Sequence, residues 1–171
     1  MTHSTEFDAD QPDEDVGATA HSSRSHHERL WAALVDRADR LTAAADGRED
    51  DRQARSILVE FLHGDVLAHL QTEAGVVYQE ARSIGAEHLV ATLETDHKFM
   101  LKLVEEIEQA DTEQEAARCA RALVVLIALR IEKEEAIVLP ALAKAGVDVN
   151  TLLEGVVAGM ATDYDARFTY L

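Results

Sequence analysis

The chain has 171 residues, and its 33 acidic against 16 basic side chains give a formal net charge of −17. This charge disfavours nucleic acid and anionic membrane surfaces as partners, and no apolar run approaches the roughly 20 residues of a transmembrane helix. The polar N-terminus lacks the apolar region of a secretory signal, so a cytoplasmic location is expected, and Cys119 as the lone cysteine excludes an intrachain disulfide.

Residues 1–22 are rich in aspartate and glutamate and hold almost no large apolar side chain. Such a segment cannot bury enough apolar surface to offset its conformational entropy, so we expect a disordered acidic tail. From residue 23 to residue 171 the pattern is helical almost throughout, with neither a β-hairpin signal nor an alternating strand pattern. We assign 23–171 to one all-α domain.

Four long helices are predicted in this domain. Capping sequences, glycines and the period of the apolar residues place them at about 25–45, 49–83, 86–109 and 112–144, followed by a short helix at about 150–159. Their connections are short, and short loops between long amphipathic helices make neighbours antiparallel. We therefore predict an up-down-up-down antiparallel four-helix bundle with a short C-terminal helix. Gly64 and Gly75 inside the second helix indicate a possible bend.

Each of the four helices carries a polar residue on the apolar stripe that should face the bundle core. In chain order these residues are His27, His69, Glu73, His97, Arg130 and Glu134. Burying such a group without a partner costs roughly 1–3 kcal/mol, and more when it is charged. Residues four apart share a helix face, so His69 and Glu73 present a nitrogen and a carboxylate to one point. Imidazole with carboxylate suits iron, zinc or manganese, and bundle cores commonly hold such sites.

The ordered motifs resemble the hemerythrin-like family, also called the HHE cation-binding domain. They are His27-Glu28-Arg29-Leu30, His69-Leu70-Gln71-Thr72-Glu73, Glu94-Thr95-Asp96-His97, and Arg130-Ile131-Glu132-Lys133-Glu134, the last running into Leu139-Pro140. The resemblance covers about residues 23–145. It implies a four-helix bundle with an iron centre in which two carboxylates, matched here by Glu73 and Glu134, bridge two irons and histidines cap each end.

The fourth helix departs from the family pattern, because Arg130 stands where the family has a histidine. Arginine keeps its proton and cannot ligate a metal, and its charge about 4 Å from a dication is repelled by roughly 8 kcal/mol at an effective dielectric of 20. The resemblance leaves as candidate metal ligands His27, His69, Glu73, His97 and Glu134. These donors suffice for one ion, with two as the alternative, and Arg130 replaces the second ion by pairing with Glu134 or Glu73.

Other interpretations of the same residues stay open. His69 and Glu73 can satisfy each other in the core without a metal, and an ion pair between Arg130 and Glu134 is a common i,i+4 arrangement. His26 competes with His27 for the position on the first helix, although the apolar stripe favours His27. Tyr78 is expected to pack in the core or at its edge.

The resemblance implies iron, with zinc or manganese as alternatives, and a small oxidant (O2, NO or peroxide) as the ligand of the metal. Reversible two-electron binding of O2 needs two irons, so the lost histidine favours a mononuclear or weakened site that senses or binds such a molecule. One alternative is a peroxide-consuming, catalase-like iron enzyme, which leaves enzymatic activity open. Another is a degenerate, metal-free bundle acting as an interaction or structural protein. The oligomeric state stays undetermined.

Overall fold

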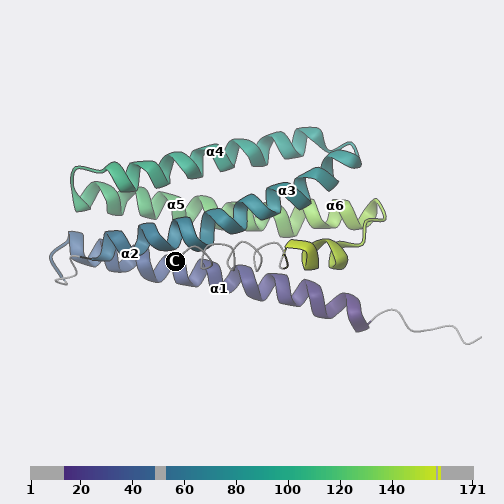
Figure 1. Ribbon diagram of the computed structural model, residues 1–171, viewed down its shortest axis with the longest axis horizontal. Coiled ribbons are helices and arrows are strands. Elements are labelled where there is room, and N and C mark those ends of the chain that lie inside the picture. The colour runs from purple at the N-terminus through teal and green to yellow at the C-terminus, as the bar shows by residue number, and fades with distance from the viewer. Residues whose placement is uncertain (1–13, 49–52, 157, 159–171) are drawn as a thin grey trace, which may run out of the picture.

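The computed structural model describes residues 14–48, 53–156 and 158 (Figure 1). Along the chain the elements are α1 (Glu14–Ala45), α2 (Ala54–Phe61), η1 (Leu62–Val66), α3 (Leu67–Ser83), α4 (Glu87–Gln109), α5 (Glu113–Lys133), η2 (Glu134–Val138) and α6 (Leu139–Lys144). The segments η1 and η2 are single π-helical turns, so α2, η1 and α3 form one continuous rod, and α5, η2 and α6 form another. The described residues contain helices and no strand, as predicted for an all-α fold.

Within the described residues, four helical rods alternate in direction and pack side by side (Figure 1). The first rod, α1, packs against α2 and α5, while α4 packs against α5 and against both α2 and α3. Each rod therefore contacts its two neighbours around a common axis. This arrangement confirms the predicted up-down-up-down four-helix bundle. In Figure 1, α4 lies along the top and α1 along the bottom.

The ends of the rods follow local sequence signals. At the start of α5 the Thr112 hydroxyl accepts a hydrogen bond from the backbone N–H of Glu115 at 3.2 Å, as its capping sequence predicts. Gly85 has a φ of 80°, a left-handed conformation that ends the second rod at little steric cost. The predicted C-terminal helix is present over residues 149–156, where the Asp148 carboxylate accepts from the backbone N–H of Asn150. Its predicted end at residue 159 lies outside the described residues.

The first rod is longer than the predicted helix. It begins at Glu14, so it extends into the stretch 1–22, which we expected from its composition to be a tail. Residues 1–13 of the same stretch lie outside the described residues.

Two apolar clusters form the core. One contains Leu34, Ala38, Leu41, Leu58, Leu62, Val66, Leu70, Met100, Val104, Ile107, Leu123 and Ile127, and the other contains Val77, Tyr78, Ala81, Val90, Leu93, Val138, Leu142 and Val156. Along α3 the first cluster stops at Leu70 and the second starts at Val77, and His69 and Glu73 are buried at this boundary. Along the α5–η2 rod Arg130 and Glu134 are buried at the same boundary. A layer of polar side chains thus divides the core.

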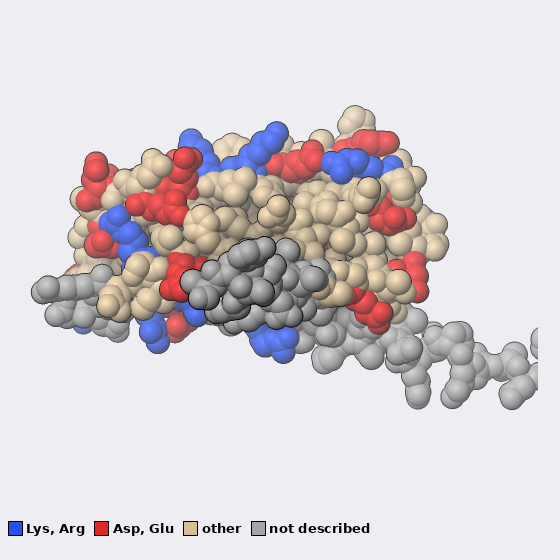
Figure 2. Space-filling model, in the orientation of Figure 1, with Lys and Arg blue, Asp and Glu red and all other residues tan. Residues whose placement is uncertain are grey.

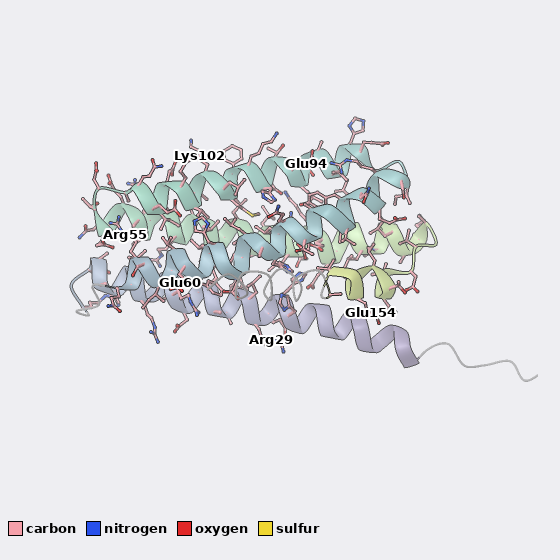
Figure 3. The ribbon with its side chains drawn as sticks, in the orientation of Figure 1. Arg29, Arg55, Glu60, Glu94, Lys102 and Glu154 are labelled. Carbon is pink, nitrogen blue, oxygen red and sulfur yellow. The ribbon has the colours of Figure 1, made fainter. Side chains whose placement is uncertain are left out.

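The surface matches the charge pattern of a water-exposed bundle. Acidic and basic side chains are interspersed along the edge formed by α4 (Figure 2), where Lys102 points away from the bundle (Figure 3). In the part of the chain that the structure describes, no helix combines the length and the apolar character needed to cross a bilayer.

Candidate metal centre

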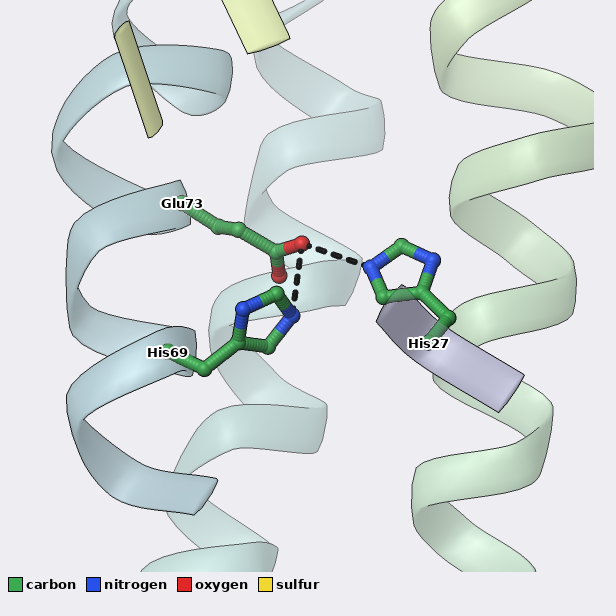
Figure 4. Close-up of side chains that lie close together, drawn as sticks. All are labelled: His27, His69 and Glu73. Carbon is green, nitrogen blue, oxygen red and sulfur yellow. Dashed lines mark hydrogen bonds and ion pairs between the residues drawn. The ribbon is translucent and has the colours of Figure 1, made fainter. Parts of the chain in front are cut away.

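Three buried side chains from two rods converge in the polar layer. His69 and Glu73 project from successive turns of α3, and His27 reaches them from α1 (Figure 4). The Glu73 Oε1 atom lies 2.9 Å from His69 Nε2 and 3.0 Å from His27 Nε2. The three ligand atoms lie within 4.8 Å of one another, and each residue is at most 4% exposed. The structure therefore brings two imidazole nitrogens and a carboxylate to one point.

A π turn precedes this group on the second rod. In η1 the backbone N–H of Leu67 donates to the carbonyl of Leu62, a five-residue step that widens the helix. Gly64, one of the two glycines at which the sequence allowed a bend, lies within this turn, whereas Gly75 lies in the regular α-helix α3. The turn adjusts the rotation of the rod just before His69, so that His69 and Leu70 are both buried in the core.

A second π turn shapes the fourth rod. In η2 the backbone N–H of Leu139 donates to the carbonyl of Glu134. Glu134 is 2% exposed and lies in the polar layer, while the adjacent Glu135 contacts His27, with 3.1 Å between Glu135 Oε1 and His27 Nδ1. The widened turn thus presents two consecutive glutamates to the same region of the bundle.

Arg130 occupies the side of Glu73 opposite the histidines. Its Nη2 atom lies 3.0 Å from Glu73 Oε2 and 4.0 Å from Glu134 Oε2, and its Nη1 atom donates to the Tyr78 hydroxyl. The guanidinium is fully buried, with 1% of the residue exposed. Of the two partners that the sequence left open, Glu73 on another rod is therefore the hydrogen-bonded one, and Glu134 is at the outer limit of an ion pair.

The pKa values of the two glutamates in the layer are shifted in opposite directions. Burial would raise the pKa of Glu73, but His69, His27 and Arg130 hold it well below its usual value. Burial and then the nearby Glu73 charge raise the pKa of Glu134 well above its usual value. Glu73 is therefore a carboxylate near neutral pH, whereas the surroundings of Glu134 favour its neutral, protonated form.

Burial opposes protonation of His27, but its hydrogen bond to Glu73 and the charges of Glu73 and Glu134 raise its pKa to about 9. A protonated His27 donates from both nitrogens, to Glu73 and to Glu135. The neighbouring His26 behaves in the opposite way. Burial, followed by the charges of His69 and His27, lowers the pKa of His26 to about 4.

The remaining sequence candidates lie at or beyond the edge of the three-residue group. Glu134 lies beside this group and interacts electrostatically with Glu73 and Arg130. Its buried Oε1 atom has no hydrogen-bond partner. His97 on α4 is half-buried and stands outside the group of close ligand atoms, and burial together with the Arg130 charge lowers its pKa. His26 packs with its ring centroid 4.9 Å from that of His69, and its buried Nε2 atom also lacks a partner.

Two residues of the layer were not assigned to the site from sequence. Tyr78 was expected only to pack, yet its hydroxyl accepts a hydrogen bond from Arg130. Glu135 contacts His27 although an α-helical pattern turns it 100° away from Glu134. The contact of Tyr78 could have been predicted, because a buried tyrosine hydroxyl usually has a hydrogen-bond partner and Tyr78 lies next to a helix face with buried charged residues.

The donor set fits a divalent metal ion. Two imidazoles with one carboxylate suit Fe(II), and also zinc or manganese, and donor separations of about 3 Å match neighbouring ligands at about 2.1 Å from one ion. The partnerless Glu134 Oε1 atom is a buried acceptor that a cation would satisfy. On the other side of Glu73 the Arg130 guanidinium already supplies a positive charge. The residues therefore fit one ion beside the histidines and disfavour a second beside Arg130.

Comparison with known proteins agrees with this chemistry. A family model described as the hemerythrin HHE cation binding domain matches residues 21–142. No curated protein and no solved structure gave a significant match. The matched segment spans more than half of the chain and contains all the candidate ligands. With the helical bundle and its buried His–His–Glu group in view, the chain belongs to the hemerythrin HHE cation-binding domain family.

Proposed function

We propose that this bundle binds one iron ion through His27, His69 and Glu73, with Glu134 as a further ligand, and that the bound iron takes up a small oxidant. The observation that carries the proposal is the convergence of three buried donor atoms within 4.8 Å of one another. Membership of a cation-binding family supports it. His97, half-buried on α4, stays a candidate for a fifth ligand.

The chain supplies a ligand set typical of Fe(II) sites with open positions. Iron held by two histidines and a carboxylate provides a redox-active centre that can bind O2, NO or peroxide. The protein contributes the exclusion of bulk water, since His27, His69 and Glu73 are nearly fully buried. It also holds His27 through Glu135, whose carboxylate accepts from Nδ1 and leaves Nε2 directed at Glu73.

Arg130 limits the site to one ion in this proposal. Its guanidinium neutralises the Oε2 side of Glu73 and leaves the Oε1 side to the histidines. A second dication next to Arg130 would face a fixed positive charge in a buried layer, where electrostatic repulsion is strong. A mononuclear site of this kind fits sensing or binding of an oxidant better than reversible two-electron transport of O2.

The metal content of the freshly purified full chain tests the proposal. We expect about one iron per chain by elemental analysis, and a rise in the melting temperature of the metal-free protein on adding Fe(II), because a ligand that binds only the folded state stabilises it. The same titration with Zn(II) and Mn(II) ranks the ions. Two tightly held irons per chain would contradict the role of Arg130.

A metal-free structural role is the second candidate, and one observation favours it. The Glu73 carboxylate is already satisfied by His27, His69 and Arg130, so the layer is largely hydrogen-bonded without an ion. If the role is structural and metal-free, the melting temperature should not change at saturating iron, zinc or manganese. The thermal measurement therefore separates the two candidates directly.

A further inference from the structure

A cleft of about 190 Å³ opens between α1 and the α5–η2 rod, beside the metal centre. The residues that line it include His27, Glu28, Trp31, Ala128, Glu132 and Glu135. His27 belongs to both the cleft and the buried His–His–Glu group. The cleft therefore leads from the surface to one of the proposed metal ligands.

The charge of the cleft is one-sided. Its lining contains three glutamates, Glu28, Glu132 and Glu135, and none of the described residues that line it is a lysine or an arginine. A concave surface lined by charge of one sign concentrates ions of the opposite sign and raises their association rate. The sign here suits a cation.

The inner end of the cleft offers a continuous set of donor atoms. Glu135 Oε1 lies 3.1 Å from His27 Nδ1, and His27 Nε2 lies 3.0 Å from Glu73 Oε1. Glu135 is 23% exposed, whereas His27 and Glu73 are each 2% exposed. Exposure thus falls sharply from the glutamate at the cleft to the two buried residues of the centre.

We propose that this cleft is the entrance through which a divalent cation reaches the buried centre, and that Glu28, Glu132 and Glu135 attract it. The inference rests on the proposed function, since it assigns a route to the ion of that same site. Glu28 and Glu132 act only through their charge, while Glu135 also positions His27.

The effect of the carboxylates should be large at low ionic strength and small at high ionic strength. In water, one negative charge about 8 Å from a dication raises the local concentration of that ion about fivefold when screening is weak. The screening length is about 30 Å at 0.01 M salt and about 3 Å at 1 M. An electrostatic entrance therefore has a characteristic salt dependence.

The first test compares two pairs of substitutions that change the net charge equally. Glu28→Gln with Glu132→Gln removes two of the three cleft charges, whereas Glu87→Gln with Glu105→Gln removes two charges at exposed positions on α4, which does not line the cleft. The probe is Co(II), added to metal-free full-length protein in stopped flow, with fluorescence from Trp31, the single tryptophan of the chain, as the signal. We expect Co(II) uptake to slow about fivefold or more at 0.01 M salt in the cleft pair only, with the difference shrinking at 1 M. Equal slowing in both pairs would reduce the effect to overall charge and overturn the proposal.

The second test blocks the cleft sterically. Ala128 lines the cleft and Ala122 lines a separate groove between α4 and α5, so Ala128→Phe and Ala122→Phe are matched substitutions on one helix. Filling an entrance slows association and dissociation by the same factor and leaves the equilibrium affinity for Co(II) unchanged. We expect this result for Ala128→Phe and unaltered rates for Ala122→Phe. Unaltered rates in a folded Ala128→Phe protein would overturn the proposal, and if that variant does not fold, the glutamine pairs decide.

The outcomes also distinguish this inference from the proposed function. If the unsubstituted protein takes up no Co(II) or Fe(II), both proposals fail. If it binds tightly, but the cleft variants bind and release Co(II) at the rates of their controls, only the entrance fails.

Discussion

The second and fourth rods carry the same arrangement of residues with different results. Each has a nitrogen-bearing side chain followed four residues later by a buried glutamate, His69 with Glu73 and Arg130 with Glu134. On α3 the pair is in direct contact at 2.9 Å, whereas on the α5–η2 rod the two side chains are 4.0 Å apart. Arg130 instead contacts Glu73 on the other rod. The fourth rod thus carries a guanidinium at the place where α3 has an imidazole, and this fixed cation pairs with Glu73.

The two glutamates give the sharpest test of this comparison. Glu73→Gln should destabilise the metal-free protein by roughly 3–5 kcal/mol, because it removes the charged partner of the buried Arg130. Glu134→Gln should change the free energy of unfolding by less than about 1 kcal/mol, since Glu134 lies at the outer limit of an ion pair with Arg130 and its surroundings favour a neutral side chain. Urea unfolding at neutral pH measures both. Equal losses in the two variants would contradict the opposite pKa shifts of the two glutamates.

The pH dependence of the metal-free protein gives a second test. The pKa of His27 is raised from its ordinary 6.5 to about 9, so its stabilising contribution is complete below 6.5 and is lost as the pH rises through 9. A shift of this size corresponds to about 3 kcal/mol. The raised pKa of Glu134 acts in the same direction.

Unfolding free energies between pH 6.5 and 9.5 measure this loss, and His27→Gln should flatten the curve. A stability that stays level over this interval in the unsubstituted protein would show that the Glu73 and Glu135 contacts do not hold a proton on His27.

How far these features follow from sequence depends on whether they lie along one helix or between helices. The rods, the buried polar layer and the inward position of Arg130 follow from a period of 3.6 residues. The partner of Arg130 does not, because the choice between Glu73 and Glu134 depends on how two rods pack. The contact of Glu135 with His27 could not be predicted from this period either, because it depends on the extra residue of the π turn in η2.

Substituting the histidines one at a time tests which part of the polar layer holds the ion. We expect His69→Ala and His27→Ala to weaken Fe(II) or Zn(II) binding by more than about 100-fold, because even the loss of an outer partner of a ligand costs about 10–100-fold. His97→Ala should have a smaller effect, since His97 lies outside the group of close ligand atoms. Isothermal titration measures the affinities, with exposed His63→Ala as the control. An equal loss on substituting His97 would place the ion nearer to α4 than we propose.

The last test gives the fourth rod the same residue pair as the second, a histidine followed four residues later by a glutamate. Arg130→His removes the fixed cation and adds an imidazole four residues before Glu134, so we expect the metal content to rise from one ion per chain toward two. Arg130→Met is the matched control, because it removes the charge without adding a donor and should stay at one ion. Elemental analysis of both variants beside the unsubstituted protein gives the answer. If Arg130→Met also takes up two ions, repulsion by the guanidinium alone limits the site. If Arg130→His stays at one ion, the geometry of the fourth rod, and not the chemistry of residue 130, sets the stoichiometry.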